Sequence, residues 1–162
     1  MTVQEYNQCV EQYADRVYRF ILKNMKNADD AQDVVQNAFE ILWKNHEGVS
    51  FEKCRSYLFT VAYHNMIDQF RKKKFDGEIG EEHEEQVQGS SYQYTGAKAA
   101  VELALKKLPA IQQQVVMLRD YEGYSYEEIG QITGLNESQV KVYIFRARTA
   151  LKNFLVSAEN AI

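Results

Sequence analysis

Apolar positions recur every three or four residues over three long stretches of the first 75 residues. This period is that of an amphipathic α-helix, and it predicts helices over residues 3–25, 29–45 and 51–74. Thr2 and Glu5 have the spacing of a capping box, so they mark the start of the first helix. Gly48, the one glycine in the first 76 residues, marks the turn after the second helix.

The second half of the chain shows the same period in shorter pieces. It predicts four helices, over about 97–107, about 109–121, from Ser125 to Gly134, and from 136 or 137 to about 156. Ser125 and Glu128 have capping-box spacing, and Gly134 suits a left-handed helix end. No stretch alternates apolar and polar residues as a strand does. The predicted class is therefore all-α.

The charge is unevenly distributed along the chain. The whole chain has 19 basic and 23 acidic residues, a net charge of −4, which taken alone argues against nucleic-acid binding. Residues 75–97, however, hold six acids and no Lys or Arg, whereas residues 1–74 and 98–162 each have a net charge of +1. The acidic piece is also rich in glycine, which predicts a flexible linker. We therefore expect two small helical domains, 1–75 and 97–162, joined by a flexible acidic linker over 76–96.

Several classes of protein are disfavoured by what the sequence lacks. Cys9 and Cys54 form no CxxC pair, and His46, His64 and His83 lack metal-ligand spacing, so we predict no metal site and no cofactor. No catalytic constellation occurs, so we do not expect an enzyme. The polar N-terminus and the absence of a long apolar run predict a cytoplasmic protein that does not insert into membranes.

Residues 125–148 have the pattern of a helix-turn-helix. A short helix and a longer one meet across a turn with glycine, and Gly130 is small where the helices would cross. On the last helix, four apolar residues would face inward: Val140, Ile144, Ala147 and Leu151. An outer face would hold Lys141, Phe145, Arg148 and Lys152, with Arg146 at its edge. A basic outer face suits the major groove of DNA, and the alternative is a plain helical hairpin with a solvated basic face.

Two further surfaces leave alternatives open. In the third helix, aromatic residues alternate with polar and basic ones ahead of the cationic run 71–74: Tyr57, Phe59, Tyr63 and Phe70. Exposed aromatics beside cations can stack on unpaired bases, whereas the other interpretation is a core helix with a basic end. The second helix has a polar outer face, which by itself indicates only contact with solvent: Asp33, Gln36, Asn37, Glu40 and Lys44.

The order of these parts resembles a known family. Three parts of the chain are similar to three successive motifs of the extracytoplasmic-function (ECF) sigma factors. The first is residues 30–39 with Trp43, and the second is residues 57–62 followed by Ile67, Asp68 and Arg71. The third consists of residues 108–109, 126–129, 140–141 and 146–148. These proteins are small two-domain initiation factors of bacterial RNA polymerase. The resemblance covers nearly everything except the linker.

The resemblance implies a role for each surface. The second helix would bind a coiled coil of the polymerase's large subunit through Asp33, Gln36, Asn37 and Glu40. The third helix and the loop 45–53 would open and read the −10 promoter element through Tyr63, His64, Asn65, Asp68 and Arg71. The last helix would read the −35 duplex through Ser138, Gln139, Lys141, Val142, Phe145 and Arg146. Asn37, Tyr63, His64, Val142 and Tyr143 depart from the residues usual in the family.

The resemblance also implies partners: core RNA polymerase, promoter DNA and an anti-sigma factor, with a monomeric free chain. The alternative function is a helix-turn-helix transcriptional regulator with no polymerase role. A plain regulator needs neither the polar face of the second helix nor the aromatic–basic third helix, and these features distinguish the two hypotheses.

Overall fold

The structure is a computed structural model that describes residues 1–75 and 96–160, with side chains up to residue 157. The chain divides into two compact units, Met1–Gln86 and Val87–Ile162. The described residues form helices and turns and include no strand, which confirms the predicted all-α class. The predicted linker over 76–96 lies outside the described residues except for Gly96, which begins a helix.

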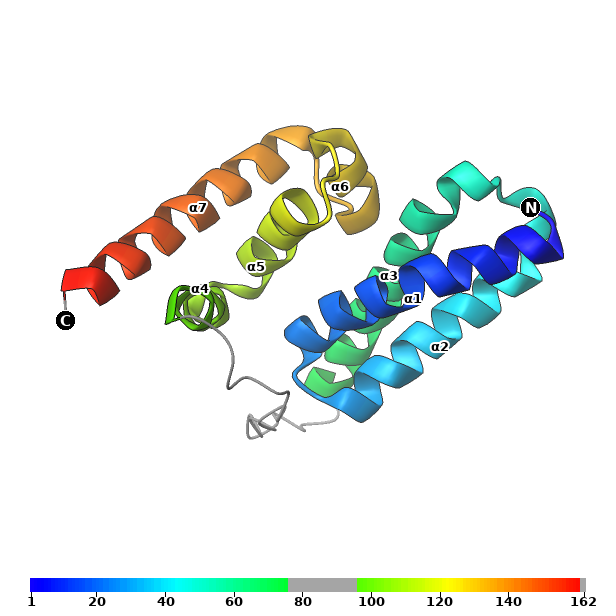
Figure 1. Cartoon of the computed structure of the whole chain (residues 1–162), viewed down its shortest axis with the longest axis horizontal. Helices are drawn as coiled ribbons and strands as arrows, with labels where there is room; N and C mark the ends of the chain where they lie inside the picture. The colour runs from blue at the N-terminus through cyan, green and yellow to red at the C-terminus, as the bar shows by residue number, and fades with distance from the viewer. Residues whose placement is uncertain (76–95, 161–162) are drawn as a thin grey trace. The chain divides into compact units, whose positions relative to one another are not determined.

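The first unit is a bundle of three long helices, α1 (Val3–Met25), α2 (Ala28–Lys44) and α3 (Cys54–Phe75). Each helix contacts the other two, and Figure 1 shows them side by side. Their apolar stripes meet in one core, whose largest fully buried side chains are Phe20, Phe59, Ile21, Leu42, Leu58 and Met66. Burial of these stripes is the main term that stabilises the bundle, because apolar area leaves water.

Local side-chain bonds fix where the first two helices begin. The predicted capping box of α1 is confirmed: the Glu5 backbone N–H donates to Thr2 Oγ1 at 3.1 Å, and the Thr2 N–H donates to Glu5 Oε1 at 2.9 Å. The second helix begins one residue earlier than predicted, because Asn27 caps it by accepting from the Asp30 N–H at 3.0 Å. Between these helices, Lys26 has a left-handed backbone with φ of 59°.

The third predicted helix is shorter at its start. A turn of 3-10 helix, η2 (Phe51–Lys53), precedes α3, and another, η1 (His46–Gly48), follows α2. Because α3 contacts both α1 and α2, it buries a wide arc that includes Phe59 and Tyr63. Of the two interpretations left open for this helix, burial supports the core helix for these two rings, and Tyr63, which the resemblance implied would meet DNA, is part of the core.

The second unit contains α4 (Gly96–Lys107), α5 (Ala110–Val116), α6 (Tyr126–Thr133) and α7 (Glu137–Asn160). The helix predicted over 109–121 is α-helical only to Val116 and then continues as a π-helical turn, η4 (Met117–Tyr121). Gly123 follows with φ of 75°, a conformation that glycine adopts without steric cost. It redirects the chain into α6.

The caps of α6 and α7 follow the sequence pattern. Ser125 and Glu128 form the predicted capping box, and Gly134 ends α6 with φ of 81°. The last helix begins at Glu137 after a reciprocal pair, in which the Gln139 N–H donates to Asn136 Oδ1 at 2.8 Å and the Asn136 N–H donates to Gln139 Oε1 at 3.0 Å. The helix runs to Asn160, about one turn beyond its predicted end.

Candidate nucleic-acid interface

The segment α6–turn–α7 is a helix-turn-helix, as the sequence predicts. The helices share a buried core, to which both contribute: Ile129, Ile132, Val140, Ile144 and Ala147. Leu135 lies in the turn and is only half-buried. A Cβ on Gly130 would lie 2.8 Å from the carbonyl oxygen of Leu135. Gly130 is therefore needed because the turn backbone crosses it, and not because the two helices do.

The outer face of α7 carries the residues predicted to meet duplex DNA. All six are exposed: Ser138, Gln139, Lys141, Val142, Phe145 and Arg146. The same helix buries Val140, Ile144 and Ala147 toward α5 and α6, so its two faces are clearly separated. Phe145 is 72% exposed and Val142 is 44% exposed. The face is thus a mixture of cations and bare apolar groups.

Two cations on α7 have acidic partners within the second unit. Arg148 forms a two-pronged ion pair with Asp120, with Nη2 to Oδ1 at 2.5 Å and Nε to Oδ2 at 3.1 Å. This hydrogen bonding raises the pKa of the Arg148 guanidinium above its ordinary value. Lys141 lies 3.4 Å from a Glu137 carboxylate oxygen and 5.7 Å from the centre of the Tyr126 ring. Both side chains are held in position against the unit's surface.

Asp120 and Tyr126 were not predicted to take part in this face. Asp120 lies 28 residues before Arg148 in the sequence, so no local spacing connects the two residues. The Arg119 guanidinium lies over the Tyr126 ring, 4.6 Å from its centre. It also donates to the Tyr124 carbonyl oxygen at 2.8 Å. These contacts join η4 to the start of α6.

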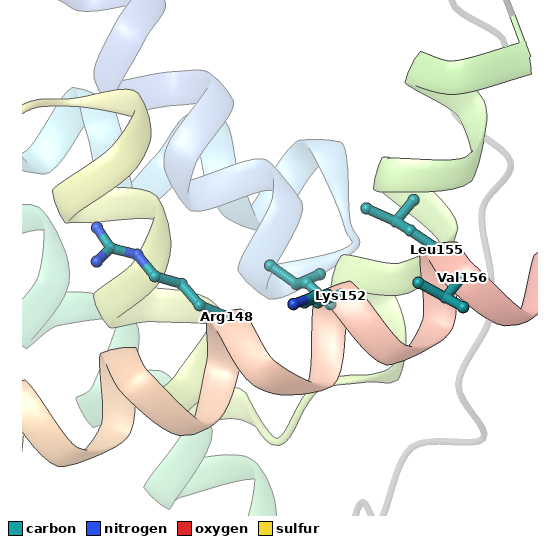
Figure 2. Close-up of a pocket in the computed structure, with 5 residues that line it drawn as sticks. Arg148, Lys152, Leu155 and Val156 are labelled. Carbon is teal, nitrogen blue, oxygen red and sulfur yellow. The ribbon is translucent and has the colours of Figure 1, made fainter.

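The C-terminal half of α7 has a shallow groove of about 300 Å³. It is lined by Arg148, Leu151, Lys152, Leu155 and Val156. Figure 2 shows Arg148, Lys152, Leu155 and Val156 along the helix. Leu151 and Leu155 are half-buried, and Val156 is 46% exposed. Leu151, which was predicted to face inward, is therefore only partly buried.

The exposed face of α3 brings together three of the five residues predicted to meet the −10 element. His64, Asp68 and Arg71 are all exposed at a spacing of four and three residues, so they lie on successive turns of one face. Tyr63 points the other way: it is only 5% exposed, and burial raises its pKa to about 12. Its ring is part of the core, in the same way that Phe59 packs edge-on against Phe20 at 5.6 Å.

The outer face of α2 holds the four residues predicted to bind the polymerase. Asp33, Gln36, Asn37 and Glu40 are exposed, and their spacing places them on one side of the helix. A groove of about 530 Å³ runs between α1 and α2 and is lined by Val10, Ala14, Asp15, Tyr18, Gln32, Val35, Gln36 and Phe39. The polar face therefore borders a groove lined by both apolar and polar side chains, which the sequence did not indicate.

Side-chain bonds connect the face of α2 to that of α3. Asn65 is half-buried, and its Nδ2 donates to Asn37 Oδ1 at 2.9 Å. Near the start of α2 and the end of α3, Lys73 pairs with Asp30. The residues predicted to bind polymerase and those predicted to read DNA thus form two adjoining surfaces, joined by an amide pair.

The loop between α2 and α3 is held by aromatic contacts. The ring of His46 stacks on Trp43 at 4.5 Å with the planes 12° apart, and Tyr6 meets the same indole edge-on at 5.0 Å. The Asn45 side chain donates both to the Ile41 carbonyl and to the Tyr57 hydroxyl, each at 3.1 Å. Within residues 1–75, η2 also contacts α1, so the loop is attached to all three helices.

Among residues 1–75 and 96–160, no three His, Cys, Asp or Glu side chains group as metal ligands would. None of the helices described is long and apolar enough to cross a membrane.

Two family models match the chain, one in each unit. Residues 9–75 match the model described as Sigma-70 region 2, and residues 98–151 match the model described as Sigma-70, region 4. The first range covers nearly all of α1, α2 and α3, and the second runs from the start of α4 to the middle of α7. Region 2 thus covers the helices predicted to bind polymerase and the −10 element, and region 4 covers most of the unit predicted to bind the −35 element.

Relatives and solved structures extend this similarity over nearly the whole chain. It is 30% identical to the RNA polymerase sigma factor SigV of Bacillus subtilis, over 86% of this chain and 84% of SigV. It is 28% identical to the ECF RNA polymerase sigma factor SigE of Mycolicibacterium smegmatis, over 96% of this chain but only 64% of SigE. Its fold is similar to that of the sigma factor RpoE of Bartonella quintana, solved with the anti-sigma factor NepR. The TM-score is 0.78 at 23% identity, over 94% of this chain and 98% of RpoE.

Proposed function

The chain belongs to the ECF sigma factors of the sigma-70 family, and from this membership we propose that it directs core RNA polymerase to promoters through three of its own helix faces. In this role it binds core polymerase, recognises the −35 and −10 elements and promotes melting of the DNA. It acts as a dissociable initiation factor and supplies no catalytic group.

One observation carries the proposal. The two sigma-70 regions match in order, and each falls on a helical unit with an exposed face suited to the role. The alternative, a helix-turn-helix regulator without a polymerase role, explains the second unit alone. It gives no reason for a region 2 match over residues 9–75.

The −35 duplex is assigned to α7. A helix with one side buried and exposed basic residues on the other fits the major groove, with its N-terminal turns at the base edges. Arg146 and Lys141 are exposed in those turns and suit phosphate contacts, which give salt-dependent affinity. Arg148 lies beside these turns and is paired with Asp120.

The −10 element is assigned to the exposed face of α3 and the loop before it. His64, Asn65, Asp68 and Arg71 can form hydrogen bonds to unpaired bases and phosphates. Tyr63 supports this face from beneath, because its ring is buried. Core polymerase is assigned to the polar face of α2, with Asp33, Gln36, Asn37 and Glu40 as its contacts.

Further partners follow from the same membership. RpoE, which shares the fold, was solved with an anti-sigma factor, and we extend such a partner to this chain. We also propose that the chain is cytoplasmic and is a monomer when free. Light scattering of the purified protein measures its mass and so tests the monomer. A dimer at micromolar concentration would contradict the monomer.

The decisive experiment is transcription in vitro with sigma-free core polymerase. Added chain should produce transcripts with one defined start on genomic DNA fragments. Glu40→Ala should weaken core binding, whereas Glu11→Ala, an exposed acid on α1, should leave it unchanged. If the chain neither binds core nor directs defined starts, the proposed function fails.

A second experiment addresses DNA contact by α7. Arg146→Ala should weaken −35 binding of the holoenzyme and lower the slope of log affinity against log salt by about 1. Lys106→Ala, exposed on α4, serves as the control and should leave both quantities unchanged. An unchanged slope for Arg146→Ala would remove that phosphate contact.

A further inference from the structure

The outer face of α7 has two bare apolar side chains at its middle. Val142 is 44% exposed and Phe145 is 72% exposed. They are three residues apart, so they lie on adjoining turns of the same side. They oppose the buried residues Ile144 and Ala147, and cations flank them on both sides. An apolar pair at the middle of a basic face indicates a partner that is charged at its edges and apolar at its centre.

Three polar side chains near this pair already have partners in the protein. The side-chain Oε1 of Gln139 accepts from the Asn136 N–H, Lys141 pairs with Glu137, and Arg148 pairs with Asp120. Reading a base through these groups requires breaking a bond first. Val142 and Phe145 need no such change, because an apolar contact replaces only water.

The major groove of DNA offers one apolar group at its base edges, the C5-methyl of thymine. This inference rests on the proposed promoter-binding role of α7. We propose that Val142 and Phe145 recognise thymine in the −35 duplex by packing against its methyl group. Phosphates on either side would meet the flanking cations, and the methyl groups would meet the apolar centre.

The spacing of the pair fits neighbouring base pairs. Three helical residues rise about 4.5 Å along the axis, and successive base pairs are about 3.4 Å apart. With α7 along the groove, the two side chains therefore reach methyl groups one base pair apart. We infer that the preferred −35 sequence holds thymines at neighbouring steps, on either strand.

Exchange of thymine for uracil tests the proposal, because it removes only the methyl group and keeps every hydrogen-bonding edge. The holoenzyme, reconstituted from core polymerase and the full chain, selects duplexes from a randomised library copied with thymidine triphosphate. Single uracil replacements in the selected −35 duplex should then weaken binding about fourfold at one or two positions, as expected when one methyl group leaves a contact.

The variants assign the effect to residues. Val142→Ala and Phe145→Ala should each abolish the penalty for uracil at one position. Val156→Ala is the matched control, because Val156 is the same residue type on the same helix at 46% exposure, yet lies about 21 Å further along it. It should keep the full penalty. All three positions are exposed, and thermal unfolding checks that each variant is folded.

The outcomes separate this inference from the function it rests on. If the holoenzyme selects a defined −35 sequence but binds thymine and uracil duplexes equally, the methyl contact is wrong and the proposed function stands. A uracil penalty that persists in both Val142→Ala and Phe145→Ala also overturns it. If the chain forms no holoenzyme and selects no sequence, the proposed function fails and this inference fails with it.

Discussion

Gly130 allows a test of how closely the recognition helix is joined to its neighbour. Alanine at a helical glycine ordinarily stabilises a protein by about 1 kcal/mol, because glycine has more backbone freedom to lose on folding. Here the added Cβ would lie 2.8 Å from the Leu135 carbonyl oxygen, which is 0.6 Å inside the 3.4 Å where ordinary contact begins. Gly130→Ala should therefore destabilise the second unit.

The turn offers little room to move away. The Gly130 carbonyl accepts from the Gly134 N–H at 2.8 Å, and the Leu135 N–H donates to Thr133 Oγ1 at 3.3 Å. Relief of the contact strains these bonds, and overpacking of this kind costs about 1–3 kcal/mol. Against a propensity gain of about 1 kcal/mol, the expected net loss is about 1 kcal/mol. For a unit of this size that lowers the melting temperature by roughly 4–8 °C.

Calorimetry of the full chain measures this shift, and amide exchange over residues 126–157 assigns it to α6 and α7. Gly96→Ala is the control, because Gly96 starts α4 and its added Cβ would meet nothing within 4 Å. If Gly130→Ala instead raises the melting temperature as much as propensity alone predicts, the close approach of the turn is wrong.

Three further predictions concern the first unit. Lys26→Gly should raise the free energy of unfolding by about 0.5–1 kcal/mol, because the left-handed backbone at Lys26 is strained with a side chain and not with glycine. Urea unfolding measures the change, and a free energy below that of the unchanged chain would refute the prediction. Burial, followed by its hydrogen bond to Cys54, raises the pKa of the Cys9 thiol, so Cys9 should resist iodoacetamide at pH 8 until urea is added. Cys54 is buried as well and should be equally protected, and rapid labelling of the native chain would contradict this. Burial raises the pKa of Tyr63 to about 12 in the folded chain. As the pH rises from about 10 to 12, the phenol therefore ionises in the unfolded chain but not in the folded one. The free energy of unfolding should fall over this range by up to ~1.4 kcal/mol per pH unit. Tyr63→Phe should flatten this decline, measured as unfolding free energy against pH, and an equal slope would count against the burial.

Features determined by short stretches of chain could be predicted from sequence. The capping boxes at Thr2 and Ser125 and the left-handed end at Gly134 depend on residues within one turn, and all three are confirmed. The helix-turn-helix followed from the same local signals combined with the apolar period. The family resemblance, carried by motifs within single helices, is confirmed by both sigma-70 regions.

Features determined by contacts between distant residues could not be predicted in this way. The apolar period alone did not show which aromatic residues of α3 are buried, and the resemblance implied that Tyr63 meets DNA, although its ring is in the core. The helix packs on two neighbours, and that widens the stripe. The ion pair of Arg148 and Asp120 joins residues 28 positions apart, and the π-helical turn at Met117 breaks a period that otherwise reads as one helix.

The amide pair between Asn37 and Asn65 has a consequence for how such a protein can change. Its 2.9 Å bond joins the surface assigned to polymerase to the surface assigned to the promoter. A substitution at Asn65 that alters promoter preference removes a hydrogen-bond partner from Asn37 and so alters the docking surface as well. The proposed promoter contact and the proposed polymerase contact therefore depend on each other at this position. An engineer who seeks a new promoter specificity on an unchanged polymerase should therefore vary His64 and Arg71, and leave Asn65 in place.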